Sequence, residues 1–332
     1  MAPSNNDDLS NSSLQTSALR PGESSFTTLR LTFSGLNLLK NILLFALIGF
    51  FIGAIPAVSD ESPTFPVRFV RPMEEGRIYT IAALAAIHES TTVSWSGSLI
   101  EQAKTDFQCE LAAAAEVLEV DEDKLPTHVR FRVFWLKKRV TGADEENLLE
   151  KNTEVEMFVT SAGSLYQINT EPVSDELHQV LALVMRLPEP ANDAIFGSAA
   201  ERRPGDKWPV NRIEAAGQFL ENGLVVQPDD LAAVVNFRDL RDVQGTKCMD
   251  IAVEMKAVNA GPELPEGFKL RTGTLEVLIS GKMPIDPSQP ILEETSEFLL
   301  QCEADGRTDG KLLDVKIEVT RTYRGRCIPY GA

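Results

Sequence analysis

Residues 312–320 read LLDVKIEVT, and this stretch decides the fold class. Leu313, Val315, Ile317 and Val319 alternate with charged or polar residues, so an extended chain here has one apolar side and one polar side. Strands of this kind are typical of antiparallel sheets, because the strands of parallel sheets are usually buried on both faces. The pattern predicts a mainly β protein in which each strand covers a core with one face.

The same alternation recurs along most of the chain. It is clear in HVRFRVFW at 128–135 and in CMDIAVEMKAV at 248–258. A turn containing Gly163 between EVEMFVT and SLYQINT predicts a hairpin. Alanine makes 77–88 and 107–120 ambiguous between helix and strand, and the alternation of Phe107 and Cys109 with polar residues favours strand. Further strands are expected at 231–240, 271–283 and 296–304.

A helix is expected between two groups of strands. Ser174 precedes DELHQVLALVMRL as a cap, apolar residues follow at helical spacing, and Pro188 comes just after the end. The strand groups on either side have a similar order, which suggests an internal structural duplication. We therefore expect two similar curved antiparallel β-sheets, with one or two intervening helices and only a minor α component. The expected segments are a first β half at 60–172, a helix and connecting segment at 173–222, and a second β half at 223–332.

The N-terminal region predicts a membrane segment. Residues 1–35 are rich in Ser, Asn and Thr and are expected to form a disordered cytoplasmic leader. Residues 36–58 contain a long uncharged apolar run, preceded by basic residues and followed by acidic ones, which places the body outside the cytoplasm. The run is either an uncleaved single-pass anchor or a signal-peptide core cleaved near Ser59, which would give a secreted protein. Its representative residues are Ile42, Phe45, Phe50, Phe51 and Val58.

Charge and cysteine spacing exclude some classes of function. The formal net charge is −17, and residues 1–59 contribute nothing to it, so the folded body carries an acidic field that disfavours nucleic acid as a partner. The four cysteines are widely spaced, without the close pairs of a zinc or thioredoxin-like site. Export permits disulfides, and both bridged and free thiols remain open. The possible disulfide cysteines are Cys109, Cys248, Cys302 and Cys327.

No motif for catalysis stands out. The three histidines, His88, His128 and His178, are far apart in the sequence, so no metal-binding spacing is present. The chain has no GxSxG, Walker or GxGxxG sequence, and adjacent acids on a strand point to opposite faces. We expect no cofactor, no metal and no catalytic residue.

One local pattern combines a turn with a tryptophan. Residues 204–209 read PGDKWP, in which Gly205 and Asp206 predict a tight turn and Trp208 is expected to enter the core. A structural role is the simpler interpretation. Trp208 is also the one weak candidate for a binding residue.

The order of these features resembles that of an uncharacterised family of exported bacterial β-proteins, over residues about 66–325. The resemblance rests on the EGRIY sequence at 75–79, the glycine turn at Gly163, the helix that follows, and PGDKW at 204–208. The first strands are rich in alanine where the family pattern has threonine. The resemblance implies a β body exported from the cytoplasm and carries over no activity and no site residue.

Three functions follow as expectations. The first is a non-enzymatic envelope protein that binds an apolar ligand, such as a lipid, or an envelope protein through a body like a β half-barrel. The alternative is a structural or interaction scaffold with a closed core. The third is a hydrolase without recognisable motifs. A membrane contact is expected through the N-terminal helix in each case.

Overall fold

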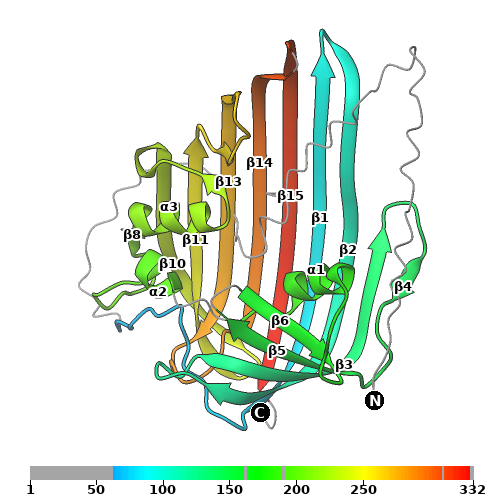
Figure 1. The fold of residues 1–332 in the computed structure, drawn as a ribbon. Helices are drawn as coiled ribbons and strands as arrows, with labels where there is room; N and C mark the ends of the chain where they lie inside the picture. Colours follow the sequence, from blue (N-terminus) through cyan, green and yellow to red (C-terminus); the bar gives the residue numbers. More distant parts are fainter. Residues whose placement is uncertain (1–62, 161–162, 188–190, 309, 330–332) are drawn as a thin grey trace, which may run out of the picture. The chain divides into compact units, whose positions relative to one another are not determined.

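The computed structural model describes residues 63–160, 163–187, 191–308 and 310–329. Within them, one 13-stranded antiparallel sheet dominates, with the strand order β7-β6-β5-β3-β2-β1-β15-β14-β13-β11-β10-β8 and β4 paired to β3 (Figure 1). Its strands are β1 (Ile78–Trp95), β2 (Ser98–Val120), β3 (Pro126–Val140), β4 (Glu145–Asn147), β5 (Glu154–Thr160), β6 (Gly163–Ile168), β7 (Glu171–Pro172), β8 (Lys207–Pro209), β10 (Leu231–Val243), β11 (Thr246–Val258), β13 (Phe268–Pro284), β14 (Glu293–Thr308) and β15 (Lys311–Pro329).

The prediction of a mainly β protein is confirmed, but the prediction of two separate sheets is wrong. The last strand, β15, pairs with the first, β1, over their whole lengths, from Tyr79 opposite Pro329 to Trp95 opposite Leu313. Both strands would otherwise present long unpaired edges, and pairing them satisfies those backbone groups. The two strand groups therefore join into one sheet.

The strand predictions for the alanine-rich segments are confirmed. β1 and β2 pair in register from Ile78 opposite Glu116 to Ile87 opposite Phe107 and beyond. Buried apolar residues of β1, β2, β3, β5, β6 and the helix at 175–184 form one cluster, which we call the main core, and Ala85, Ala113 and Ala115 are fully buried in it. Their small side chains leave room for a helix against this part of the sheet, so packing decides the structure here and overrides the helix propensity of alanine.

Tight turns fix the register of two long hairpins. β1 and β2 are joined through Ser96 and Gly97, with φ of 51° and 77°. β10 and β11 are joined through Gln244 and Gly245, with φ of 53° and 81°. Two successive residues with positive φ are the signature of turns whose twist matches that of a hairpin, and glycine adopts this conformation without strain.

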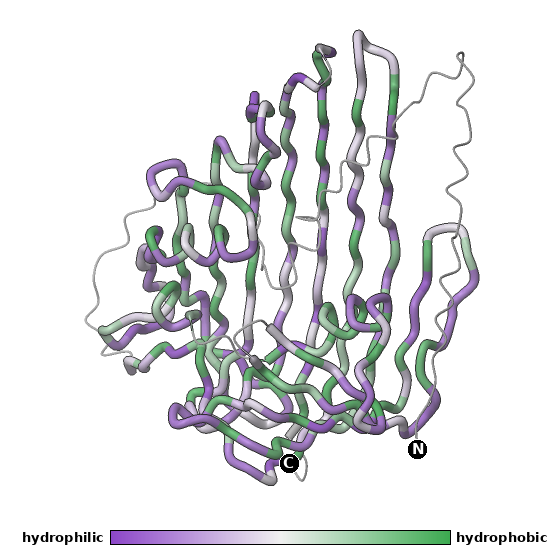
Figure 2. The backbone as a smooth tube through the Cα atoms, in the orientation of Figure 1, coloured by the Kyte–Doolittle hydropathy of each residue, from purple (hydrophilic) through white to green (hydrophobic). Residues whose placement is uncertain are grey.

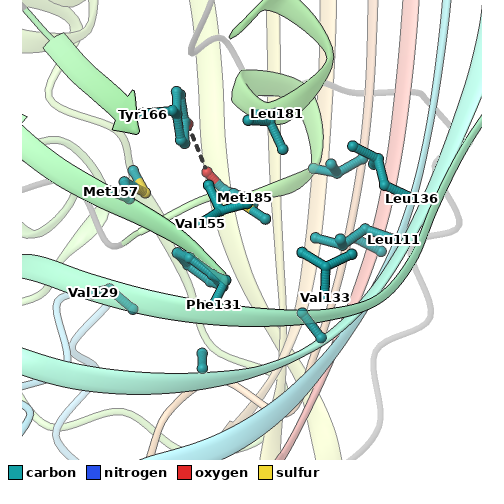
Figure 3. Packing of buried hydrophobic residues seen from close by; sticks show 14 of the residues in the cluster. Leu111, Val129, Phe131, Val133, Leu136, Val155, Met157, Tyr166, Leu181 and Met185 are labelled. Atoms are coloured by element: carbon teal, nitrogen blue, oxygen red, sulfur yellow. Dashed lines mark hydrogen bonds between the residues drawn. The ribbon is translucent and has the colours of Figure 1, made fainter. Parts of the chain in front are cut away.

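The predicted helix is confirmed as α1 (Asp175–Val184), with the side chain of Ser174 accepting a hydrogen bond from the backbone N–H of Leu177 at 3.3 Å. α1 contacts β1, β2, β6 and β15. Its apolar residues pack on the main core, in which the Tyr166 hydroxyl donates to the carbonyl of Met185 at 3.3 Å (Figure 3). The other elements are α2 (Ala191–Phe196), α3 (Arg212–Glu221), the 3₁₀ turn η2 (Pro228–Asp230) and the small β9 (Leu224–Val225) and β12 (Gly261–Pro262) pair.

The predicted membrane segment at 36–58, with Ile42, Phe45, Phe50, Phe51 and Val58, lies outside the described residues, as do the leader at 1–35 and Ser59. Among the helices of the described part of the chain, none is both long and apolar enough to span a bilayer.

Candidate ligand-binding face

The central strands of the sheet have one apolar and one polar face. Along β15, Leu313, Val315, Ile317 and Val319 are buried on the same face, and the residues between them are more exposed. Hydropathy alternates in the same way along the neighbouring long strands (Figure 2). The register aligns these residues with Val93 of β1 and with apolar residues of β14 and β13, so the apolar side continues across four strands. We call this side the apolar face.

The apolar face is long compared with the helices. β1 has 18 residues, which corresponds to about 60 Å at ~3.3 Å per residue. α1 has 10 residues, which corresponds to about 15 Å at ~1.5 Å per residue. A single helix of that length covers only a part of such strands, and α1 lies on the part that contains the main core. Side chains farther along the strands are nonetheless buried, and Val93 is 4% exposed.

A buried ion pair interrupts the apolar face. The guanidinium of Arg321 on β15 donates to the Glu89 carboxylate on β1, with a distance of 3.0 Å from Nε to Oε1. The two side chains are 12% and 9% exposed. Burial lowers the pKa of Arg321, and the Glu89 carboxylate opposes that effect. A charge pair in this setting needs good geometry to offset the cost of losing water.

Arg186, just after α1, brings a second cation to the same place. Its guanidinium lies over the Tyr323 ring, 3.9 Å from the centroid, and donates to the Ser296 hydroxyl at 3.3 Å and to the Leu183 carbonyl at 3.3 Å. In the part of the chain that the structure describes, no carboxylate oxygen lies within 4.0 Å of it. A partly buried guanidinium without a paired carboxylate is suited to bind an anion, to which its N–H groups can donate.

Glu294 completes this group, which we call the polar cluster: Glu89, Arg186, Glu294, Ser296, Arg321 and Tyr323. Burial raises the pKa of Glu294, with the nearby Arg186 acting in the opposite direction. Burial also raises the pKa of the Tyr323 phenol, and the proximity of Glu294 adds to this effect. The cluster therefore has a carboxyl that gains a proton more readily than usual, near a guanidinium that makes no ion pair within 4.0 Å among the described residues.

A glycine shapes the surface beside the cluster. Gly325 pairs with Glu294 across the strands. A Cβ atom at Gly325 would lie 2.3 Å from the Tyr323 hydroxyl oxygen. The Tyr323 side chain therefore lies flat along its own strand, across the space that a larger residue at 325 would occupy, and there it stacks under Arg186.

Sequence reasoning missed the polar cluster, although a signal was present. In LLDVKIEVTRTYR at 312–324 the alternation demands an apolar residue at 321, and the sequence has arginine. In β1 the same register places Glu89 where an apolar residue is expected. A charge at an apolar position predicts a buried polar site, but its partner on a strand over 200 residues away cannot be read from the sequence.

Trp208, the weak binding candidate, is buried on β8 next to β10. Its indole N–H donates to the Phe196 carbonyl at 2.8 Å, and the Arg202 guanidinium lies 5.1 Å from its ring centroid. The predicted turn before it is present, with Gly205 at φ of 93°. These contacts give Trp208 the expected role in the core, and it lies on different strands from the polar cluster.

The four cysteines lie on four different strands, β2, β11, β14 and β15, and all four are free thiols. Burial raises the pKa of three of them to about 12. It raises the pKa of Cys248 to about 11. Thiols with such high pKa values are poor nucleophiles at neutral pH. Within the described ranges, no three His, Cys, Asp or Glu side chains gather in an arrangement able to hold a metal ion.

Another buried arginine, Arg71, has a structural environment. It donates to the carbonyls of Pro284 and Asp286 at 3.0 and 3.1 Å, which ties the segment before β1 to the end of β13. Its Nε and Nη2 atoms have no hydrogen-bond partner among the described residues. Burial lowers its pKa to about 10, against the opposing effect of Asp193 and Asp286. Those two carboxylates disfavour an anion at this position.

No protein-family model matches the chain, and no curated protein matches it. Among solved structures, a lipovitellin structure concerned with lipid–protein interactions is similar with a TM-score of 0.33 and 10% identity, over 78% of this chain and 26% of that one. The chain thus spans about a quarter of the lipovitellin chain. The Pseudomonas aeruginosa protein OpdQ is similar with a TM-score of 0.19 and 9% identity, over 76% of this chain and 98% of that one. At these TM-scores the likeness says nothing about function.

Proposed function

We propose that the protein is a non-enzymatic envelope protein that binds an apolar ligand, such as a lipid, on the apolar face of its sheet. The observation that carries the proposal is the combination of a long apolar face with one cation, Arg186, that makes no ion pair within 4.0 Å among the described residues. A chain-like apolar ligand would lie along the strands, and a polar end would contact the cluster.

The contacts of Arg186 suit it to bind the polar end of a ligand rather than to fill a position in the core. Its stacking on Tyr323 and its bonds to Ser296 and Leu183 hold the guanidinium plane in place but use only part of its donor capacity. The remaining donors can bind an oxygen-rich group of a ligand. The Glu89–Arg321 pair beside it balances its own charge, which leaves Arg186 as the cation that a ligand would meet.

A scaffold with a closed core is the second candidate. Burial of Val93 and Leu300, which lie outside the main core that contains α1, favours it, because a filled interior needs no ligand to complete it. In that case the polar cluster would act only to hold β1, β14, β15 and the end of α1 together.

Native mass spectrometry of the detergent-solubilised full chain tests the proposal, together with extraction of the lipids that purify with it. We expect a bound lipid at defined stoichiometry, and a lower occupancy in Arg186→Gln. Arg324→Gln is the matched control, because Arg324 is an exposed arginine on β15 that points to the opposite face from its neighbour Tyr323, on which Arg186 stacks. A ligand-free mass for the wild type would reject the ligand-binding function and support the scaffold.

A further inference from the structure

Four large apolar side chains are exposed at one end of the central strands. Residues 95–100, WSGSLI, comprise the end of β1, the turn and the start of β2, and they carry no charge. The register places Trp95 opposite Leu313 of β15, so this turn lies beside the one that joins β14 and β15. We call Trp95, Leu99, Ile100 and Leu312 the hairpin tip.

The hairpin tip is unusually exposed for its composition. The exposed fractions of its four residues lie between 44% and 61%. The part of β2 that follows the turn is coloured hydrophobic (Figure 2). Trp95 lies opposite Leu313, whereas Leu312 and Leu99, which is opposite Ser94, point to the other face of the sheet. The ends of these two neighbouring hairpins are therefore apolar on both faces, and exposed apolar side chains gathered in this way mark an interaction site.

A lysine beside the tryptophan points to the kind of partner. The ammonium of Lys311 lies 4.9 Å from the centre of the Trp95 ring. Tryptophan with a neighbouring lysine is typical of the boundary between lipid and water, where the ring is placed among the headgroups and the ammonium reaches water or phosphate. Aliphatic residues next to them can enter the acyl region.

We propose that the hairpin tip inserts into the surface of a lipid bilayer. The apolar side chains drive the contact, since the net charge of −17 opposes approach to an anionic surface and Glu101 follows the tip directly. A zwitterionic bilayer is therefore the preferred surface. The tip also adjoins the apolar face, because Trp95 and Val93 point to the same side of β1. A membrane contact would thus lie at the end of the face along which a lipid is proposed to bind.

Quenching by brominated lipid tests the insertion in the full chain. The protein contains three tryptophans, Trp95, Trp135 and Trp208. The full chain would be incorporated in phosphatidylcholine vesicles with and without brominated acyl chains. We expect quenching in the wild type, loss of most of it in Trp95→Phe, and retention in Trp135→Phe. Trp135 is the matched control, because it is 40% exposed but lies on β3.

A second variant removes two apolar side chains of the hairpin tip and keeps Trp95 as the reporter. Leu99→Ser with Ile100→Ser leaves the turn and the exposed tryptophan in place, and each apolar side chain removed from lipid weakens partition about tenfold or more. We expect the Trp95 signal to lose its quenching while Tm stays unchanged, and vesicles with anionic lipid to give weaker quenching than phosphatidylcholine.

Three results would overturn the proposal. The first is equal quenching in Trp95→Phe and the wild type. The second is a Trp95 signal that iodide quenches equally well with and without vesicles. The third is a Trp95 signal that is shielded from iodide but not quenched by bromine, which would indicate a protein partner or a second copy. The amount of lipid that purifies with the protein is measured separately, so failure of the tip leaves the ligand-binding function to be judged by its own test.

Discussion

The buried pair of Glu89 and Arg321 offers the sharpest test of the energetics of the apolar face. Replacement of Glu89 by Ala removes the carboxylate to which Arg321 donates with both Nε and Nη2. Removal of one member of a buried pair costs about 3–5 kcal/mol, because the other charge remains away from water without its counterion. The Arg321 side chain is 12% exposed, so water that reaches it keeps the cost below the upper end of this range.

The expected change can be measured as a shift in Tm. For folded domains of 150–250 residues, 1 kcal/mol shifts Tm by about 2–4 °C, so Glu89→Ala should lower it by about 6–20 °C. Intrinsic tryptophan fluorescence during heating of the full chain in detergent follows the transition. Arg271→Ala is the control, because Arg271 pairs with Glu303 and Asp314 on the exposed side of the sheet, and its loss should leave Tm unchanged within error.

A double variant separates the charge from the packing. Replacement of Glu89 by Leu together with Arg321 by Met removes both charges and keeps similar volumes, so we expect it to recover most of the stability lost in Glu89→Ala. Two results would refute the reasoning. One is a Tm for Glu89→Ala that matches Arg271→Ala, and the other is a double variant as unstable as the single one.

Four further predictions concern the same body. Gly325→Ala forces the Tyr323 ring to move and should cost about 1–3 kcal/mol, whereas Gly217→Ala, with no atom within 4 Å of the added Cβ, should not lower Tm. Because burial raises the folded-state pKa of Glu294, its ionisation destabilises the fold. Glu294→Gln should therefore be more stable than the wild type at pH 8, and the difference should vanish as the pH falls to about 4, near the unfolded value. Ser174→Ala removes the cap of α1 and should cost about 1 kcal/mol by the same thermal assay. Alkylation of the unfolded protein without reductant should modify all four cysteines, while the native protein should react slowly; fewer than four modifications would reveal a disulfide.

The strands and the main helix could be predicted because local side-chain periodicity determines which residues face the core. The alternation in 312–320 and the cap at Ser174 are both complete within a few residues of sequence, and the structure has β15 and α1 at these places. The strand structure of the alanine-rich β1 and β2 is harder to predict from sequence, since alanine favours a helix in isolation. Their buried alanines are explained only by packing in the main core, which involves residues far away in the sequence.

The union of the two strand groups could not be predicted, because alternation specifies the faces of a strand and not its neighbours. The pairing of β1 with β15 joins residues separated by almost the whole folded body. The same limit applies to the polar cluster. Glu89 and Arg321 were visible as charges at apolar positions, but their contact depends on that pairing and on its register.

Because the contact between Glu89 and Arg321 depends on the register of β1 and β15, the pair also helps to fix that register. A slip of one residue between β1 and β15 would turn all side chains of one strand to the other face. Arg321 would then leave the apolar face and Glu89 would stay behind, buried without the guanidinium that neutralises it. The cost of an unpaired buried charge adds to the cost of turning apolar side chains such as Val315 out of the core, so the pair reinforces the register that apolar alternation already favours. The seam between the first and last strands therefore has a charge pair that adds to its apolar packing in fixing the register. The apolar double variant should recover most of the stability lost in Glu89→Ala but pair less uniquely, which hydrogen exchange along β15 would detect.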